Sequence, residues 1–298
     1  MKSVLPILTV LFALVLIWYG AAIGLNAQWT RDQAARAGVE VSFSDILSDT
    51  LSQARPKLPA PHQVAVELYQ STWDEEVNGR RGIVATGTLS NRSLIYHGWV
   101  TLSATMLGFA FGTGLGILLA VGIVHSKAMD MSFMPWAIAS QTVPILAIAP
   151  MVIVVLASIG IKGLIPKAII AAYLSFFPVL VGMVKGFRAP DTMQLDLLKT
   201  YNASRFGTFW RLRLPSSVPY LFASLKVGIA AALVGTIVGE LPAGASAGLG
   251  ARLLSGSYYG QTIQIWAALL AAAALAAGLV VIVGVIERIV LGRMGMRS

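Results

Sequence analysis

The residues best suited to binding chemistry form one polar, basic stretch between two apolar regions. Residues 196–219 read DLLKTYNASRFGTFWRLRLPSSVP, which combines aromatic and basic side chains and ends in two prolines. Because proline stops a helix, the stretch predicts a short helix with a rigid boundary. Aromatic and arginine side chains are enriched where proteins bind one another, so the stretch is suited to docking on a partner protein. The alternative is an ordinary basic loop held near membrane lipid headgroups.

Polar side chains are rare inside the apolar runs, and two of them stand beside a proline. Gln141 and Thr142 lie between Pro135 and Pro144. An interrupted membrane helix exposes backbone and amide groups, and such groups can contact a solute. The alternative is that both side chains form hydrogen bonds between helices, worth about 0.6–2 kcal/mol.

Two charged residues and two aromatic residues complete the candidates. Glu240 ends an apolar run, where an acid is either a gate or substrate contact, or an anchor between helix and loop. Lys226 lies roughly 10 Å beyond Pro219 along a helix, so its ammonium group can snorkel to the interface. Tyr173 and Phe177 can stack on a flat ring or pack in the core.

The residue types do not support an enzyme active site, a metal site or a nucleic-acid-binding surface. The chain has no cysteine and 3 scattered histidines, which excludes thiolate sites and leaves no histidine cluster for a metal. The apolar runs hold no Ser/His/Asp set or paired carboxylates at helical spacing, and the sequence has no phosphate-binding G-x-x-x-x-G-K-[ST] loop. The net charge of +9 is carried between and beyond the apolar runs. We therefore expect no catalytic residue, no metal and no nucleic acid.

Composition predicts an all-α polytopic membrane protein. Hydrophobic residues make up 56% of the 298 residues and charged residues only 12%, with a mean hydropathy of +0.76. Ordinary soluble domains carry about 25% charged residues. Charged residues are absent from residues 3–30, 93–126, 131–161, 168–184 and 253–286. A membrane-spanning helix needs about 20 residues, and every run except 168–184 is longer than that. Helices are the structure that suits apolar runs of this length.

The pattern predicts about six transmembrane helices. They cover residues 4–25, 94–124, 133–159, 164–186, 218–240 and 262–291. The first run is longer than the apolar core of a signal peptide, so we expect an uncleaved anchor. The third span is interrupted by Pro135, Pro144 and Pro150, each of which removes a backbone donor.

The second predicted span carries a face of small residues. Gly108, Gly112 and Gly116 stand four residues apart. Because these positions share one side of a helix, the backbone of another helix can approach closely there. We expect this face to pack directly against a neighbouring span.

The spans divide the chain into four parts. These are an anchor over residues 1–25, an extracytoplasmic segment with a short interfacial helix over 26–93, a five-span core over 94–291, and a tail over 292–298. Residues 185–215 hold six bases against two acids, whereas the bases of the long first loop are offset by acids. Loop Lys and Arg residues favour the cytoplasmic side, so we expect both termini in the cytoplasm. No function is predicted for residues 26–57 and 74–92.

The polar stretch resembles the cytoplasmic loop of ABC-importer permeases. That family's signature is Glu-Ala-Ala, three residues, Gly, nine residues, Ile, any residue and Leu-Pro. The matching positions are Asp196-Leu197-Leu198, Asn202, Leu212 and Leu214-Pro215. The spacing is retained throughout, and asparagine is the next-best residue for the left-handed turn that the glycine makes in the family.

Other segments are similar to the nitrate/sulfonate/taurine-type branch of that family. They are Leu58-Pro59-Ala60-Pro61, Gln141 to Pro150, Phe176-Phe177-Pro178, and Glu240 with Gly248-Leu249-Gly250. The resemblance covers about residues 58–290. It implies a type I ABC-importer permease fold in the bacterial inner membrane.

The resemblance also implies partners and roles. This chain would be a permease subunit, not an enzyme, that binds no cofactor, while a cytoplasmic ABC ATPase dimer uses ATP-Mg. A second permease subunit, in a homodimer or heterodimer, would complete the path, and a periplasmic substrate-binding protein would deliver the solute. The ATPase would bind the coupling loop 187–215 through Asp196, Leu197, Leu198, Asn202, Ala203, Arg205, Leu212, Leu214 and Pro215. The path would involve Gln141, Thr142, Pro144, Tyr173, Phe177 and Glu240.

The resemblance leaves the substrate open between a pyrimidine-like heterocycle and a small organic anion. An anion path should carry basic residues deep inside the spans, and Lys226 is the one base that lies more than four residues from the end of a predicted span. This disfavours strong anions. The alternative function is a secondary transporter or channel driven by a gradient through Glu240 and Lys226.

Overall fold

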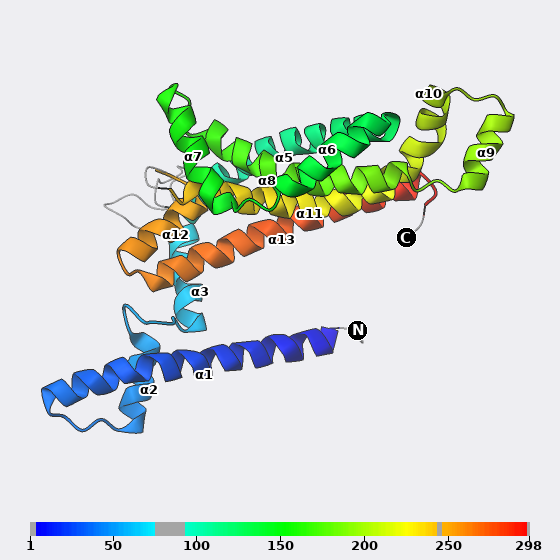
Figure 1. The fold of residues 1–298 in the computed structure, drawn as a ribbon. Coiled ribbons are helices and arrows are strands. Elements are labelled where there is room, and N and C mark those ends of the chain that lie inside the picture. Colours follow the sequence, from blue (N-terminus) through cyan, green and yellow to red (C-terminus); the bar gives the residue numbers. More distant parts are fainter. Residues whose placement is uncertain (1–3, 75–92, 243–245, 297–298) are drawn as a thin grey trace. The chain divides into compact units, whose positions relative to one another are not determined.

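A computed structural model describes residues 4–74, 93–242 and 246–296. All the regular elements in these ranges are helical, which confirms the predicted all-α class (Figure 1). They are α1 (Val4–Ala37), α2 (Phe43–Ser52), α3 (Pro61–Tyr69), η1 (Gln70–Asp74), α5 (Leu94–His125), α6 (Lys127–Ser140), α7 (Ile145–Ser158), α8 (Leu164–Phe187), α9 (Thr192–Thr200), α10 (Arg205–Thr208), η2 (Phe209–Arg213), α11 (Leu214–Glu240), α12 (Leu249–Tyr258) and α13 (Thr262–Arg293). Nearly all of the predicted charged loop 74–92 lies outside the described residues.

Within the described residues, five helical stretches are long and apolar enough to cross a membrane. They are Leu5–Ala37, Leu94–His125, Leu164–Phe187, Arg205–Glu240 and Thr262–Arg293. A sixth candidate is the pair α6 and α7, which together are as apolar but are bent by 95°. The predicted count of about six spans is therefore met when this bent pair is taken as one span.

The third predicted span breaks at one proline rather than at three. Pro135 and Pro150 lie inside α6 and α7, whereas Pro144 directly precedes the first residue of α7. Proline has no N–H to continue the hydrogen bonds of the preceding helix, and it is well tolerated at a helix start. The break at Gln141–Pro144 therefore follows from the proline that falls between the two helices.

The chain divides into two compact units. One comprises residues 1–98 with 251–272, and the other comprises residues 99–250 with 273–298. In the first unit, α1 continues to Ala37, beyond the predicted end of the apolar span at residue 25. The polar extension of α1 is covered by α2, an element that the sequence pattern did not predict (Figure 1).

A buried asparagine organises the chain that follows α1. Asn26 is fully buried, and its Oδ1 accepts hydrogen bonds from the Lys57 and Leu58 N–H groups at 2.9 and 3.3 Å. Its Nδ2 donates to the Leu58 carbonyl at 2.9 Å. A second network joins Thr30 of α1 to Asp49 of α2 at 2.6 Å. Because buried polar groups need partners, these bonds fix the path of residues 26–60 against α1.

Aromatic contacts complete the first unit. The Trp18 indole N–H donates to the Pro59 carbonyl at 2.9 Å, and its ring lies 5.1 Å from that of Trp266 on α13. The short helix expected near residues 62–73 is present as α3 and η1. Its predicted place on the membrane surface stays a prediction.

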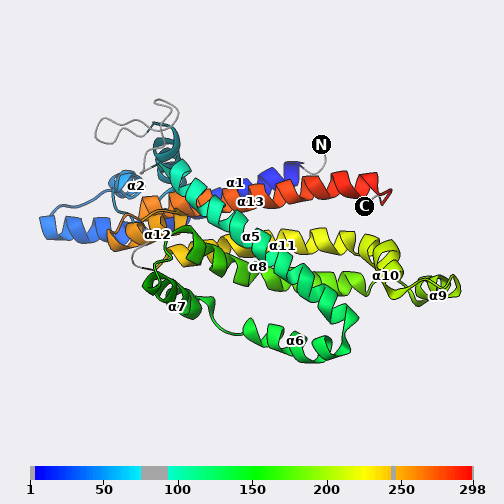
Figure 2. The same ribbon diagram turned by 90° about the horizontal axis from the view of Figure 1, so that it is seen from above.

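In the second unit, α8 and α11 lie side by side, and α5 crosses α8 obliquely (Figure 2). The crossing uses the predicted glycine face. A Cβ atom on Gly116 would lie 2.7 Å from the Phe176 carbonyl oxygen, and one on Gly112 would lie 2.7 Å from that of Ala172. The backbones of α5 and α8 are therefore in direct contact, as the spacing of small residues predicted.

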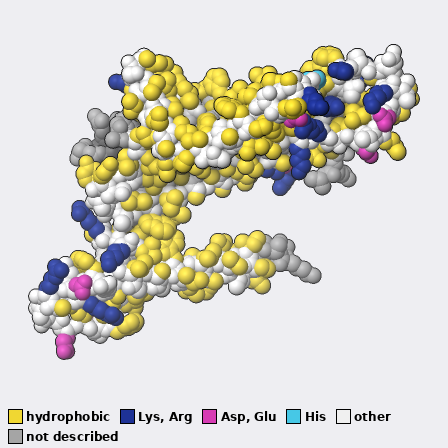
Figure 3. Space-filling view, in the orientation of Figure 1, with side chains coloured by type: hydrophobic (Ala, Val, Ile, Leu, Met, Phe, Trp, Pro, Cys, Tyr) yellow, Lys and Arg dark blue, Asp and Glu magenta, His cyan; other side chains and the backbone are white. Residues whose placement is uncertain are grey.

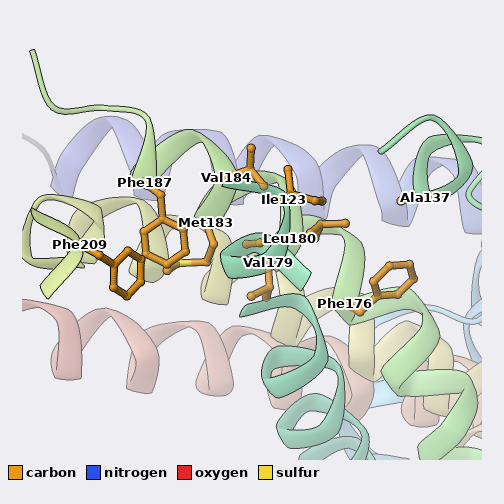
Figure 4. Packing of buried hydrophobic residues seen from close by; sticks show 10 residues of the cluster. Ile123, Ala137, Phe176, Val179, Leu180, Met183, Val184, Phe187 and Phe209 are labelled. Atoms are coloured by element: carbon orange, nitrogen blue, oxygen red, sulfur yellow. The ribbon is translucent and has the colours of Figure 1, made fainter. Parts of the chain in front are cut away.

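In the described part of this unit, apolar side chains pack in a larger and a smaller cluster. The larger cluster joins α5, α6, α8 and η2 through buried Ile123, Ala137, Phe176, Val179, Leu180, Met183, Val184, Phe187 and Phe209 (Figure 4). The smaller one joins α11 to α13 through Phe222, Ile229, Leu279 and Val283. The second half of α13 therefore packs on α11.

The glycine face gives a testable prediction. Gly116→Leu should lower the thermal unfolding midpoint of the detergent-purified protein by several degrees, because overpacking a tight contact costs about 1–3 kcal/mol. Gly114 is the matched control, since nothing lies within 4 Å of the space that its Cβ would take. Equal shifts for Gly116→Leu and Gly114→Leu would contradict the close packing of α5 on α8.

Candidate functional site

The turn between α9 and α10 is left-handed. Asn202 has φ +51°, and in the described residues it is the one non-glycine residue with a positive φ. Its N–H donates to the Lys199 carbonyl at 2.9 Å, and the Ala203 N–H donates to the Leu198 carbonyl at 3.0 Å. These two bonds form a left-handed helix end of the Schellman type. The left-handed turn expected at Asn202 is therefore confirmed.

A buried phenylalanine anchors the segment to the spans. Phe209 lies on η2, is 8% exposed, and packs 5.1 Å from the Phe187 ring of α8 and 5.0 Å from the His125 ring of α5. Figure 4 shows Phe187 and Phe209 facing each other at the end of the cluster. This anchor was not predicted, because nothing in the local pattern distinguishes Phe209 from its exposed aromatic neighbours.

Polar contacts tie the same end of the unit. The Arg213 guanidinium donates to the Phe187 carbonyl at 3.3 Å, which satisfies a carbonyl at the end of α8. Arg188 forms an ion pair with Asp130 of α6 at 2.8 Å. Residues 187–215 are therefore tied by polar contacts to the end of α8 and to α6.

Residues 187–215 also carry exposed apolar side chains. Those of Met193, Leu197, Tyr201, Phe206 and Trp210 are all more than half exposed. The pair Asp196–Lys199 is also exposed, with 2.8 Å between Oδ1 and Nζ. Exposed apolar patches of this kind mark interaction surfaces. Of the other predicted residues, Asn202 and Arg205 are exposed, and Leu198, Ala203, Leu212, Leu214 and Pro215 are half-buried.

The break between α6 and α7 is fixed by a tyrosine. The Tyr173 hydroxyl of α8 donates to the Ser140 carbonyl, which has lost its helical partner at the end of α6. The Gln141 amide contacts the Ser140 hydroxyl at 3.3 Å, and Thr142 donates to the Ala139 carbonyl at 2.8 Å. The structure thus brings three of the predicted path residues together. Thr142 and Pro144 are exposed, while Tyr173 and Phe177 are half-buried.

Glu240 lies in a separate, fully buried cluster. Its side chain is 0% exposed, and its carboxylate accepts from the Thr101 hydroxyl at 2.9 Å and the Gly250 N–H at 2.9 Å. The Lys167 ammonium lies 3.2 Å from Oε1. A buried carboxylate is costly unless it is paired and hydrogen-bonded, and here α5, α8 and α12 supply those partners.

The partners of Glu240 also hold the loop before α12. Lys167 donates to the Ala247 carbonyl at 2.7 Å, and the Thr101 hydroxyl accepts from the Leu249 N–H at 2.9 Å. Gly248 has φ +127°, and a Cβ on it would collide with the Glu240 carboxylate. These contacts favour the anchor interpretation of Glu240 over the gate interpretation.

Comparison with known proteins decides the family. The sequence matches the model of the binding-protein-dependent transport system inner membrane component over residues 112–296, more than half of the chain. The chain belongs to this family. It is a permease subunit of an ABC importer and a multi-pass protein of the inner membrane.

Individual relatives point the same way. The permease is 30% identical over 232 residues to the riboflavin transport system permease protein of Chloroflexus aurantiacus. The aligned residues make up 78% of this chain and 78% of the relative. It is 29% identical over 168 residues to the formylaminopyrimidine transport permease protein of Halalkalibacterium halodurans, covering 56% of this chain and 65% of the relative. It is 25% identical over 177 residues to a putative aliphatic sulfonates transport permease protein of Bacillus subtilis, covering 59% and 62%. The family implies an ATPase and a substrate-binding protein as partners of the permease.

The sequence pattern did not predict three contacts between charged or polar side chains of the permease. Lys167 and Thr101 are both buried beside Glu240, and Lys226 of α11 forms an ion pair with Glu287 of α13. A basic or hydroxyl side chain inside an apolar run could have indicated these contacts, because such a side chain needs a partner in a neighbouring helix. The sequence does not reveal which helix supplies it.

The Glu240 cluster predicts strong coupling between two residues. Glu240→Gln should destabilise the permease by about 3–5 kcal/mol, because it leaves the Lys167 ammonium buried without a carboxylate. The double variant Glu240→Gln/Lys167→Met should recover part of the loss, measured by thermal unfolding in detergent. Asp196→Asn is the control, since its pair with Lys199 is exposed and should contribute about 0–1 kcal/mol. The coupling is disproved if the destabilisations caused by Glu240→Gln alone and by Lys167→Met alone add up to that of the double variant.

The turn at Asn202 predicts a residue preference. Asn202→Val should destabilise the turn by about 1–2 kcal/mol, because a β-branched residue is strained at positive φ. Asn202→Gly should be neutral or stabilising, since glycine adopts this conformation freely. Hydrogen exchange of the Asn202 and Ala203 amides measures the effect. Faster exchange in the glycine variant than in the valine variant would contradict the assignment.

Proposed function

We propose that this permease imports a flat heterocyclic solute and couples to an ABC ATPase dimer through residues 187–215. A periplasmic substrate-binding protein delivers the solute, and a second permease subunit completes the path. The observation that carries the coupling is that residues 187–215 have two different faces. One face is buried through Phe209 against α5 and α8, and the other exposes Leu197, Tyr201 and Trp210.

The two faces suit the transmission of force. An exposed apolar and aromatic surface provides the contact that a partner needs. The Phe209 packing and the Arg213–Phe187 hydrogen bond join that surface to the ends of α5 and α8. A movement imposed on the exposed face therefore passes directly to the membrane helices.

ATP chemistry belongs to the partner in this proposal. The sequence has no phosphate-binding G-x-x-x-x-G-K-[ST] loop. ATP-Mg is bound and hydrolysed by the ATPase, and this chain contributes no catalytic residue and holds no cofactor.

The orientation follows from the ATPase contact. Residues 187–215 face the cytoplasm, and six crossings place both termini on that side. The α6–α7 pair then counts as one crossing, and residues 26–93 lie outside the cytoplasm. The excess of bases over acids in residues 185–215 supports this orientation.

The proposed path runs beside the break between α6 and α7. Gln141, Thr142 and Pro144 present amide, hydroxyl and backbone groups there, and Tyr173 with Phe177 supplies aromatic surface. Glu240 is left out of the path, because its carboxylate is buried among Thr101, Lys167 and Gly250.

A heterocycle fits the path better than a strong anion. Lys167 and Lys226, which lie inside candidate spans, are each paired with a glutamate, so neither offers an uncompensated positive charge. The relatives named for riboflavin and formylaminopyrimidine are 30% and 29% identical, and those named for aliphatic sulfonates and nitrate are 25% and 22% identical. Both observations support a flat, weakly charged ring.

Proteoliposome transport tests the coupling. Tyr201→Ala/Trp210→Ala should reduce ATP-dependent uptake tenfold or more while the ATPase subunit still hydrolyses ATP, because the contact face is truncated. Tyr258→Ala/Trp29→Ala, which also removes two exposed aromatic side chains, should leave uptake near the unmodified level. Uptake driven by an ion gradient without ATPase subunits would overturn the proposal in favour of a secondary transporter. Failure of riboflavin and pyrimidines to bind the cognate receptor, with binding of sulfonates instead, would overturn the substrate class alone.

A further inference from the structure

We propose that a basic hollow beside residues 187–215 binds the phosphate headgroup of an anionic phospholipid. The hollow has a volume of about 540 Å³. Its lining residues are Val124, His125, Leu195, Lys199, Ala203, Arg205, Thr208 and Arg213. It therefore lies between the end of α5 and the elements α9, α10 and η2.

The lining is positively charged and lacks acidic side chains. Arg205 and Arg213 form no ion pair with a carboxylate in the part of the chain that the structure describes. Arg213 gives one N–H to the Phe187 carbonyl and keeps others for a ligand. Lys199 also pairs with Asp196 outside the lining. Guanidinium groups match the geometry of phosphate oxygens, so the hollow is suited to a phosphate-bearing ligand.

The hollow lies where membrane helices end. α5 ends at His125 and α8 ends at Phe187, and both are candidate spans. Figure 3 shows Lys and Arg side chains gathered at the end of the unit that carries α9 and α10, next to largely hydrophobic flanks. Phospholipid headgroups lie at this boundary between apolar helix and polar loop, and basic pockets there attract anionic lipids.

Exposed apolar side chains on α5 and at the start of α6 offer a surface for the acyl chains. Leu118 is 72% exposed and stands seven residues before His125, so the two share one face of α5. Met131 of α6 is 69% exposed. A volume of about 540 Å³ also exceeds what a single phosphate ion fills. A lipid uses both the basic hollow and the adjoining apolar surface, which a free phosphate or an acidic side chain of a partner does not.

The inference goes beyond the proposed function and does not depend on the ATPase. Tyr201 and Trp210, which the uptake experiment truncates, are not among the residues that line the hollow, whereas Ala203 and Arg205 belong both to the lining and to the predicted ATPase contact. Lipid binding and ATPase binding are therefore measured separately on the same variants. Lipid binding is measured on the full permease chain without any ATPase subunit.

Native mass spectrometry of the detergent-purified permease provides the test. Dioleoylphosphatidylglycerol should bind at least tenfold more tightly than dioleoylphosphatidylcholine. Arg205→Gln/Arg213→Gln should abolish that preference, and Arg205→Gln alone should weaken it, since Arg205 is exposed and its loss leaves the fold intact. Arg211→Gln is the matched control, because Arg211 is an exposed base of η2 outside the lining.

Five results would overturn the proposal. One is that the unmodified permease shows no preference for phosphatidylglycerol. Another is that the preference survives Arg205→Gln/Arg213→Gln. A third is that Arg211→Gln reduces the preference as strongly as the double variant does, which indicates general charge attraction. Inorganic phosphate or glycerol phosphate binds as tightly as the lipid, which assigns the hollow to a free phosphate compound. Arg205→Gln/Arg213→Gln keeps lipid binding but loses the ATPase subunit, which assigns the hollow to the ATPase.

Discussion

The buried carboxylate of Glu240 is the contact on which the arrangement of the second unit depends. It is 0% exposed, and its partners come from α5, α8 and α12. A charge in such a place is tolerated only with all of its partners present, because desolvation costs several kcal/mol per ion. The same carboxylate explains why glycine stands at position 248, where a side chain would collide with it. One acid therefore links α5 and α8 to the turn at Gly248 and to the residues that follow it directly.

The opposite end of the same helices is fixed by apolar packing. Phe209 fills the space between His125 of α5 and Phe187 of α8, and Arg213 caps the end of α8. Between the two ends, Gly112 and Gly116 bring α5 into backbone contact with α8. Packed interiors transmit strain because they are dense, so helices held at both ends respond together. This rigidity is what a permease needs if an ATPase acts on it from one side.

Local patterns in the sequence predicted much of the fold. The apolar runs gave the class and the approximate spans, and the four-residue spacing of glycines gave the face of α5 that meets α8. The exceptions have physical reasons. Pro135 and Pro150 stay inside helices while Pro144 separates two. The helix α1 runs on to Ala37, because partners far along the chain, such as Lys57 and Leu58, satisfy its buried Asn26.

The candidate sites divide in the same way. The sequence was sufficient for the spacing of residues 196–215 and for the left-handed turn at Asn202, because a turn depends on residues only a few positions apart. Only the tertiary structure decided how Glu240 is satisfied, since Thr101 and Lys167 stand 139 and 73 residues away along the chain. It also decided that Phe209 is buried while nearby Tyr201, Phe206 and Trp210 are exposed. Burial and charge pairing are set by which helices meet, and that is a property of the whole packed chain rather than of any local pattern.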